Sequence, residues 1–145
     1  MKRWLTALAL LLLAPLAVQA APVLVETDWL AQRLDDPGIV VVDMTDDRMQ
    51  YQRFHLPGAL RLPYGELVQR RHDRVSVRVD DARLIALLGE LGIGADRHVV
   101  IYDDVGGLNA GRLFWELERI GHPAVSVHDG GLVKWVLEGR AVENR

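Results

Sequence analysis

The stretch HVVIYDDVGGLNAGR at residues 98–112 joins an apolar run to an acidic, glycine-rich turn and the start of a helical pattern. The run at 98–103 does not alternate with polar residues, which is typical of a strand buried on both faces of a parallel sheet. After the glycines, apolar residues recur at helical spacing from Ala110 to Leu117 and predict a helix that Gly121 ends. A buried strand followed at once by a helix indicates an α/β fold.

The rest of the chain repeats this alternation of strand and helix. Further apolar runs predict strands at 39–44, 59–63 and 124–129. Three more helices are predicted: one capped by Thr27 and stopped by Pro37-Gly38, one from Asp80 to Gly92, and one at 132–139. This order predicts an open sheet with helices on both faces, in which ligands bind beyond the carboxyl ends of the strands. The turn after Tyr102 lies at such an end.

One segment has two interpretations. Val75, Val77 and Val79 alternate with polar residues, as in an edge strand, but an extended surface loop fits the segment equally well. The region is also basic. This charge is either for contact with an anion or a partner or simply part of a solvated face; the residues are Arg70, Arg71, Arg74 and Arg78.

Residues 1–20 have the features of a secretory signal peptide: a basic start, an apolar centre, and Val18 and Ala20 spaced as at a cleavage site after Ala20. A membrane anchor is disfavoured because Pro15 interrupts an apolar run shorter than the roughly 20 residues of a spanning helix. We therefore expect a domain at residues 21–145 in the periplasm or outside the cell, with no stable membrane anchor after cleavage. Removing Lys2 and Arg3 changes the net charge from −3 (17 basic, 20 acidic) to −5 (15 basic, 20 acidic), which disfavours nucleic-acid binding.

The residue types present exclude several kinds of chemistry. The chain has no cysteine, so neither a thiol nor a disulfide is available. Its five histidines do not form a metal-binding pattern, so we expect no metal and no cofactor. Half of the residues are hydrophobic, enough for one packed core, in which we expect Trp29, Trp115 and Trp135 to lie in the core or at helix–sheet contacts.

Three stretches together resemble the rhodanese-like sulfurtransferases: YQRFHLPGAL at 51–60, HVVIYDD at 98–104, and VSVHDGGLVKWVLEGRAVE at 125–143. The resemblance covers nearly the whole mature chain and implies a mainly parallel sheet of five strands. Residues 103–131 are most similar to the first domain of two-domain thiosulfate sulfurtransferases, which keeps the fold while the second domain carries the reactive cysteine.

The resemblance implies that a catalytic domain would have its cysteine where this chain has Asp103. Sulfur transfer needs a thiolate that attacks a sulfane sulfur and carries it as a persulfide, and a carboxylate cannot form that bond. We therefore expect this chain alone to be inactive in sulfur transfer and to have no catalytic residue. Its expected partner is a second, catalytic rhodanese domain, either covalently attached or in trans.

The turn still supplies candidate loop or ligand residues. Asp103 has two interpretations: its carboxylate replaces an anion among the backbone N–H groups of the loop, or it simply caps the following helix. Either way, acidic residues here would repel thiosulfate, and the glycines indicate unusual backbone dihedrals. The candidates are Asp103, Asp104, Gly106, Gly107, Asn109 and Arg112.

Three hypotheses for the function remain open. The first is an exported, non-catalytic domain that supports or docks a catalytic sulfurtransferase domain. The second is a free-standing module that binds an oxyanion or a partner in the periplasm. The third is an enzyme of another class, such as the cysteine phosphatases that share the rhodanese fold, but that chemistry also requires the missing cysteine.

Overall fold

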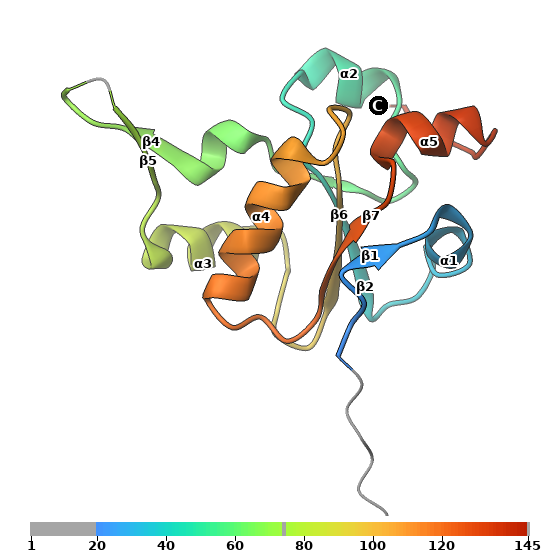
Figure 1. The fold of residues 1–145 in the computed structure, drawn as a ribbon, viewed down its shortest axis with the longest axis horizontal. Helices are drawn as coiled ribbons and strands as arrows, with labels where there is room; N and C mark the ends of the chain where they lie inside the picture. The colour runs from blue at the N-terminus through green and yellow to red at the C-terminus, as the bar shows by residue number, and fades with distance from the viewer. Residues whose placement is uncertain (1–19, 74, 145) are drawn as a thin grey trace, which may run out of the picture.

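A computed structural model describes residues 20–73 and 75–144 (Figure 1). The predicted signal peptide lies outside the described residues, apart from Ala20. Within the described part of the chain, no helix has the length and apolar character needed to cross a bilayer.

The centre of the molecule is a sheet of five parallel strands in the order β1-β7-β6-β2-β3. The predicted mainly parallel five-stranded sheet is therefore confirmed, and β6 is its middle strand. The strands are β1 (Leu24–Val25), β2 (Ile39–Asp43), β3 (Leu60–Arg61), β6 (His98–Tyr102) and β7 (Val125–His128).

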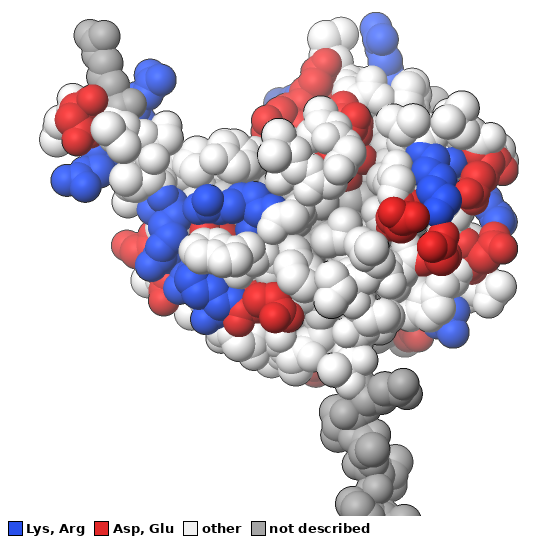
Figure 2. Space-filling model, in the orientation of Figure 1, with Lys and Arg blue, Asp and Glu red and all other residues white. Residues whose placement is uncertain are grey.

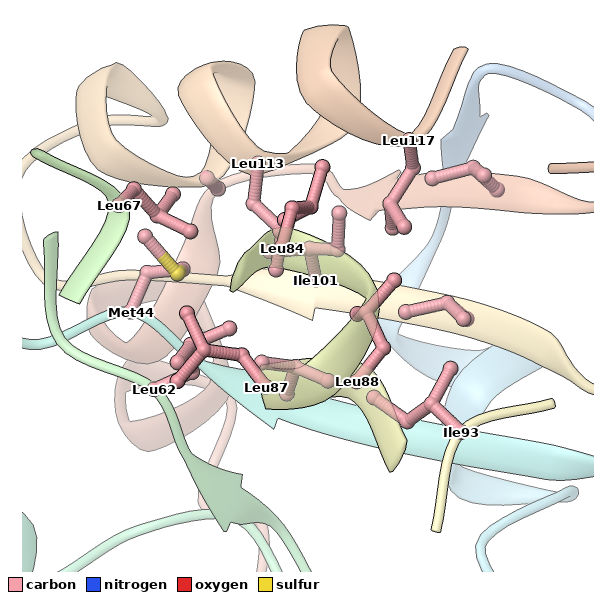
Figure 3. Packing of buried hydrophobic residues seen from close by; sticks show 14 of the residues in the cluster. Met44, Leu62, Leu67, Leu84, Leu87, Leu88, Ile93, Ile101, Leu113 and Leu117 are labelled. Carbon is pink, nitrogen blue, oxygen red and sulfur yellow. The ribbon is translucent and has the colours of Figure 1, made fainter. Parts of the chain in front are cut away.

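Helices cover both faces of this sheet, as the sequence predicts. Neighbouring residues of one strand belong to different cores: Val42 packs in the core beneath α3 (Asp81–Glu90) and α4 (Leu108–Arg119), and Val41 packs in the opposite core. Figure 3 shows the first core, where leucines of α3 and α4 meet residues of the sheet. In the second core, buried side chains come from α1 (Thr27–Ala31) and α5 (Gly131–Leu137).

The segment with two interpretations forms a strand, but not in the main sheet. β5 (Ser76–Arg78) pairs antiparallel with β4 (Val68–Arg70) in a separate two-stranded sheet. This hairpin follows the 3₁₀ helix η1 (Tyr64–Leu67) and projects from the body of the molecule (Figure 1).

The predicted helix boundaries agree best with the structure where a polar side chain caps the helix. Asp80 accepts a hydrogen bond from the backbone N–H of Arg83 at 2.8 Å, and the predicted helix there is confirmed as α3. The predicted cap at Thr27 is wrong: Thr27 is already helical and buried, and its hydroxyl contacts Nε2 of His128 at 3.1 Å. The side chain is thus turned toward the core instead of toward the free N–H groups of the helix.

A further helix, α2 (Arg48–Arg53), is absent from the sequence-based assignment. It begins at Asp47, whose side chain accepts a hydrogen bond from the backbone N–H of Met49 at 2.8 Å. The helix is too short to show a helical repeat in its sequence.

Candidate functional site

Asp103 is the first residue after the central strand β6 and is 1% exposed. Its Oδ1 accepts hydrogen bonds from the backbone N–H groups of Val105 at 3.1 Å and Gly107 at 2.8 Å. Its Oδ2 accepts from Asn109 at 2.8 Å and Ala110 at 2.9 Å. We call these four N–H groups the Asp103 cradle.

The glycines make the cradle possible. Gly106 and Gly107 have φ values of 73° and 90°, in the left-handed region where a side chain is strained. These dihedrals turn the loop around the carboxylate, so that α4 starts beside it.

The Asp103 carboxylate both caps the following helix and takes the place of an anion in the loop. Oδ2 binds the second and third N–H groups of α4, which have no acceptor within the helix, as a helix cap does. Oδ1 meanwhile gathers the N–H groups of the preceding loop, as a bound anion would. The positive end of the helix dipole also favours a negative charge here.

Asp104 lies outside the cradle. It is partly exposed and lines a groove between α2 and α5. Partial burial raises the pKa of its carboxyl group, and repulsion from Asp103 and Asp43 acts in the same direction.

Helix α5 holds the loop from the other side. The backbone N–H of Leu132 donates to the carbonyl oxygen of Asp103 at 2.9 Å. Gly131 approaches so closely that a Cβ atom there would lie 2.4 Å from the same oxygen. The position of the loop therefore depends on a residue without a side chain.

A buried polar network that sequence reasoning missed lies under the loop. The hydroxyl of Tyr102 donates to Oδ2 of Asp43 at 2.5 Å and accepts from the backbone N–H of Leu56 at 3.0 Å. Oδ1 of Asp43 accepts from the backbone N–H of Thr45 at 2.7 Å. Burial, together with the nearby Asp43 carboxylate, raises the pKa of Tyr102 far above its usual value. An aspartate at the end of β2 was the available signal, because the register places it beside Tyr102.

Asn109 and Arg112 take part in a different feature, a surface cavity of about 670 Å³ between η1 and α4. Asn109 also donates from Nδ2 to the carbonyl oxygen of Met44 at 3.2 Å. The lining residues are Asp46, Tyr64, Leu108, Asn109, Gly111, Arg112 and Trp115. Trp115 is 50% exposed, so the expectation that it packs in the core or against the sheet is wrong.

The charged groups beside this cavity are organised around Glu116, whose side chain is 1% exposed. Arg112 donates from Nε and Nη2 to Oε1 of Glu116, and Arg119 donates from Nε and Nη2 to Oε2. Both guanidinium groups also lie near the indole of Trp115, at 5.4 and 5.8 Å from the ring centre. Figure 2 shows basic side chains gathered over α4 and the neighbouring hairpin.

The structure thus divides the six candidate residues. Asp103 occupies the cradle, Gly107 and Asn109 supply two of its N–H groups, and Gly106 shapes the loop between them, whereas Asp104 and Arg112 line two separate surface depressions. Among the described residues, no three side chains of His, Asp or Glu are grouped as metal ligands would be. At the end of the central strand the site presents a hydrogen-bonded carboxylate, which cannot carry a transferable sulfur atom.

A model of the rhodanese-like domain matches residues 26–138, from α1 to the end of α5. The chain belongs to the rhodanese-like family. The match includes every strand of the main sheet except β1 and the whole Asp103 cradle.

Curated relatives agree with this assignment. The chain is 36% identical over 120 residues to the sulfur carrier protein TtuD of Thermus thermophilus, covering 81% of the chain and 41% of the relative. It is 34% identical over 122 residues to a thiosulfate sulfurtransferase of Pseudomonas aeruginosa, covering 84% of the chain and 45% of the relative. The rhodanese-like chain therefore spans less than half the length of these relatives.

Solved structures show the same fold. The 3-mercaptopyruvate sulfurtransferase SseA of Escherichia coli superposes with a TM-score of 0.70 at 28% identity, covering 85% of the chain and 50% of SseA. The 3-mercaptopyruvate sulfurtransferase of Leishmania major superposes with a TM-score of 0.74 at 23% identity, covering 84% and 36% respectively.

Proposed function

We propose that this chain is an exported, non-catalytic rhodanese-like domain that supports or docks a catalytic rhodanese domain, within one polypeptide or in trans. The observation that carries the proposal is the Asp103 carboxylate in the Asp103 cradle. The resemblance of the loop to the family's catalytic loop implies a cysteine at this position, and the chain has no cysteine anywhere.

The cradle supports this proposal by its chemistry. Persulfide formation needs a thiolate nucleophile, and the N–H groups that could stabilise a thiolate or an anionic substrate are already used by Asp103. An incoming thiosulfate would also meet the partly exposed carboxyl group of Asp104.

The supporting role is favoured by the lengths of the relatives. The chain corresponds to less than half of each of the two relatives described above and to half of SseA. The resemblance of residues 103–131 to the first domain of two-domain thiosulfate sulfurtransferases supports the proposal that this chain corresponds to the half that keeps the fold and lacks the nucleophile. A native product about twice the length of this 145-residue chain would establish the covalent arrangement.

A thiocyanate-release assay tests the absence of catalysis. We expect the purified chain, given thiosulfate and cyanide, to release thiocyanate no faster than buffer does. A clear rate that rises in proportion to protein concentration would overturn the proposal. The same protein should show no added sulfur atom by intact-mass spectrometry after incubation with thiosulfate.

The cavity beside α4 favours a second candidate function, a module that binds an oxyanion or a partner. Arg112 and the half-exposed Trp115 line this cavity together with Asn109. Isothermal titration with thiosulfate, sulfite and sulfate separates the candidates: saturable micromolar binding would favour the binding module over the purely supporting role.

We also propose that the protein is exported, because residues 1–20 have the pattern of a signal peptide. Amino-terminal sequencing of the protein from fractionated cells should begin at Ala21 in the periplasmic or secreted fraction. An intact Met1 on protein recovered from the cytoplasm would contradict it.

A further inference from the structure

Helix α5 carries apolar residues on its covered side and also on part of its exposed side. Leu132 and Trp135 are buried in the core, at 3% and 1% exposure. Val133, Val136 and Leu137 face outward at 54%, 44% and 81% exposure. Exposed apolar side chains that cluster on one surface mark an interaction site, so this outer face of α5 has the composition of an interface.

The outer face of α5 borders a groove of about 350 Å³, the α2–α5 groove. Its lining includes Gln50 and Phe54 from the α2 side, with Val133, Val136 and Leu137 from α5. Among the described residues that line the groove, Asp104 is the only ionisable one. α2 and α5 lie side by side at the carboxyl end of the sheet (Figure 1).

We infer that the α2–α5 groove and the outer face of α5 bind a second copy of this chain, with the two α5 helices packed antiparallel about a twofold axis. This inference does not depend on the proposed function, because it concerns association alone.

The shape of the surface is self-complementary. Leu137 is the most exposed large apolar residue among those described, and it stands at the edge of an apolar hollow. A twofold axis brings the same patch of both copies together, so the projecting Leu137 of each copy faces the hollow of the other. Val133 and Leu137 are one turn apart on the same side of α5, which is the spacing that helices use to pack together.

The charges beside the apolar face fit the same arrangement. Lys134 lies on one flank of α5, and Glu138 lies one turn further along at the end of the helix. Antiparallel packing places Lys134 of one copy opposite Glu138 of the other. Nζ of Lys134 already contacts Glu26 at 2.7 Å and Asp129 at 3.1 Å, so Glu138 of a second copy would be a third carboxylate around an ammonium group that has three donors. A parallel arrangement would instead set like charges opposite each other.

The apolar patch is small, which sets the expected strength of association. Three exposed side chains and one groove make an interface at the low end of the range for specific complexes. We therefore expect a weak dimer that dissociates on dilution, with affinity in the micromolar range.

Sedimentation velocity of the purified protein from low micromolar to millimolar concentration tests the inference. We expect a reversible shift from monomer to dimer. Leu137→Lys and Val133→Lys should each weaken association by roughly tenfold or more, because each places an unpaired charge in the interface. Ile85→Lys is the matched control, since Ile85 is 59% exposed on α3, away from the groove, and this variant should associate like the original protein.

A charge reversal tests the antiparallel arrangement. Glu138→Lys should weaken the dimer, because it sets a second cation opposite Lys134 of the other copy, and thermal unfolding confirms that the variant is folded. A protein that stays monomeric at every concentration would overturn the inference and leave the groove to another partner, such as a catalytic rhodanese domain. A dimer that Leu137→Lys and Val133→Lys leave unchanged would overturn it as well.

Discussion

At the scale of single residues, the site depends on how one carboxylate is used. Asp103 binds two loop N–H groups with one oxygen and two helix N–H groups with the other. Sequence reasoning could identify Asp103, because an acidic residue between a strand and a helix is visible. It could not count the donors, since the number depends on the dihedrals of Gly106 and Gly107.

Replacing Asp103 by alanine should lower stability. Four N–H groups lose their acceptor, and two of them lie at the amino end of α4. We expect the free energy of unfolding to fall by about 2 kcal/mol or more, measured by urea denaturation. Asp104→Ala is the control, because Asp104 lies outside the cradle, and it should change stability by less than about 0.5 kcal/mol. Equal effects of the two substitutions would show that the cradle contributes nothing.

Tyr102 gives a second prediction at this scale. Tyr102→Phe removes the hydroxyl that joins Asp43 to the backbone N–H of Leu56 and leaves both groups buried without this partner. We expect a loss of about 1–3 kcal/mol in the free energy of unfolding. Tyr64→Phe makes the same chemical change at a partly exposed residue, and its denaturation curve should match that of the original protein.

At the scale of elements, sequence patterns succeed where a helix is long and capped by its own side chains. α3 has a leucine stripe, a cap at Asp80 and a left-handed Gly92, so its existence and its ends could be predicted. α2 has six residues and no stripe, and its start at Asp47 became visible only in the structure. Thr27 misled the prediction because its hydroxyl contacts His128, a residue 101 positions away.

The close contact between α5 and the loop after β6 predicts that Gly131 does not tolerate a side chain. Gly131→Ala should strain a left-handed backbone and bring Cβ against the carbonyl oxygen of Asp103. Gly139→Ala is the matched control, because its φ is also positive but a Cβ there has no atom within 4 Å. We expect Gly139→Ala to cost about 1 kcal/mol and Gly131→Ala to cost at least about 1 kcal/mol more. Thermal unfolding curves that coincide for the two variants would contradict the close approach.

The contact between α3 and α4 predicts a dependence on pH. Hydrogen bonds from Arg119 and Arg78 lower the pKa of Asp81 from 3.8 to about 2. Since the folded-state pKa lies below the unfolded one, the stabilisation is fully present above about pH 4 and is lost as the pH falls toward 2. The difference in urea midpoint between the original protein and Asp81→Asn should therefore close over this range and should shrink in high salt. A difference that stays constant down to pH 2 would show that Asp81 has no such pairing.

At the scale of the whole molecule, alternating apolar strands and helices were enough to predict the class of fold. The prediction holds because β2 and β6 are apolar on both faces, as a sheet covered on both sides requires. The strand order and the separate β4–β5 hairpin could not be predicted, because both depend on contacts between distant segments. For the same reason, the network of Asp43, Tyr102 and Leu56 and the cavity beside Trp115 appeared only in the structure.

The central claim is that the loop after β6 forms a cradle for an anionic nucleophile whose place Asp103 occupies. Because the chain has no cysteine, Asp103→Cys and Asp104→Cys each introduce a single thiol. The pH dependence of alkylation gives the pKa of each thiol. We predict a pKa at least about one unit below the ordinary value of about 8.5 for Cys in place of Asp103, because the cradle N–H groups and the start of α4 stabilise a thiolate. For Cys in place of Asp104 we predict no such lowering. Equal pKa values at the two positions, or a higher one at position 103, would contradict the account.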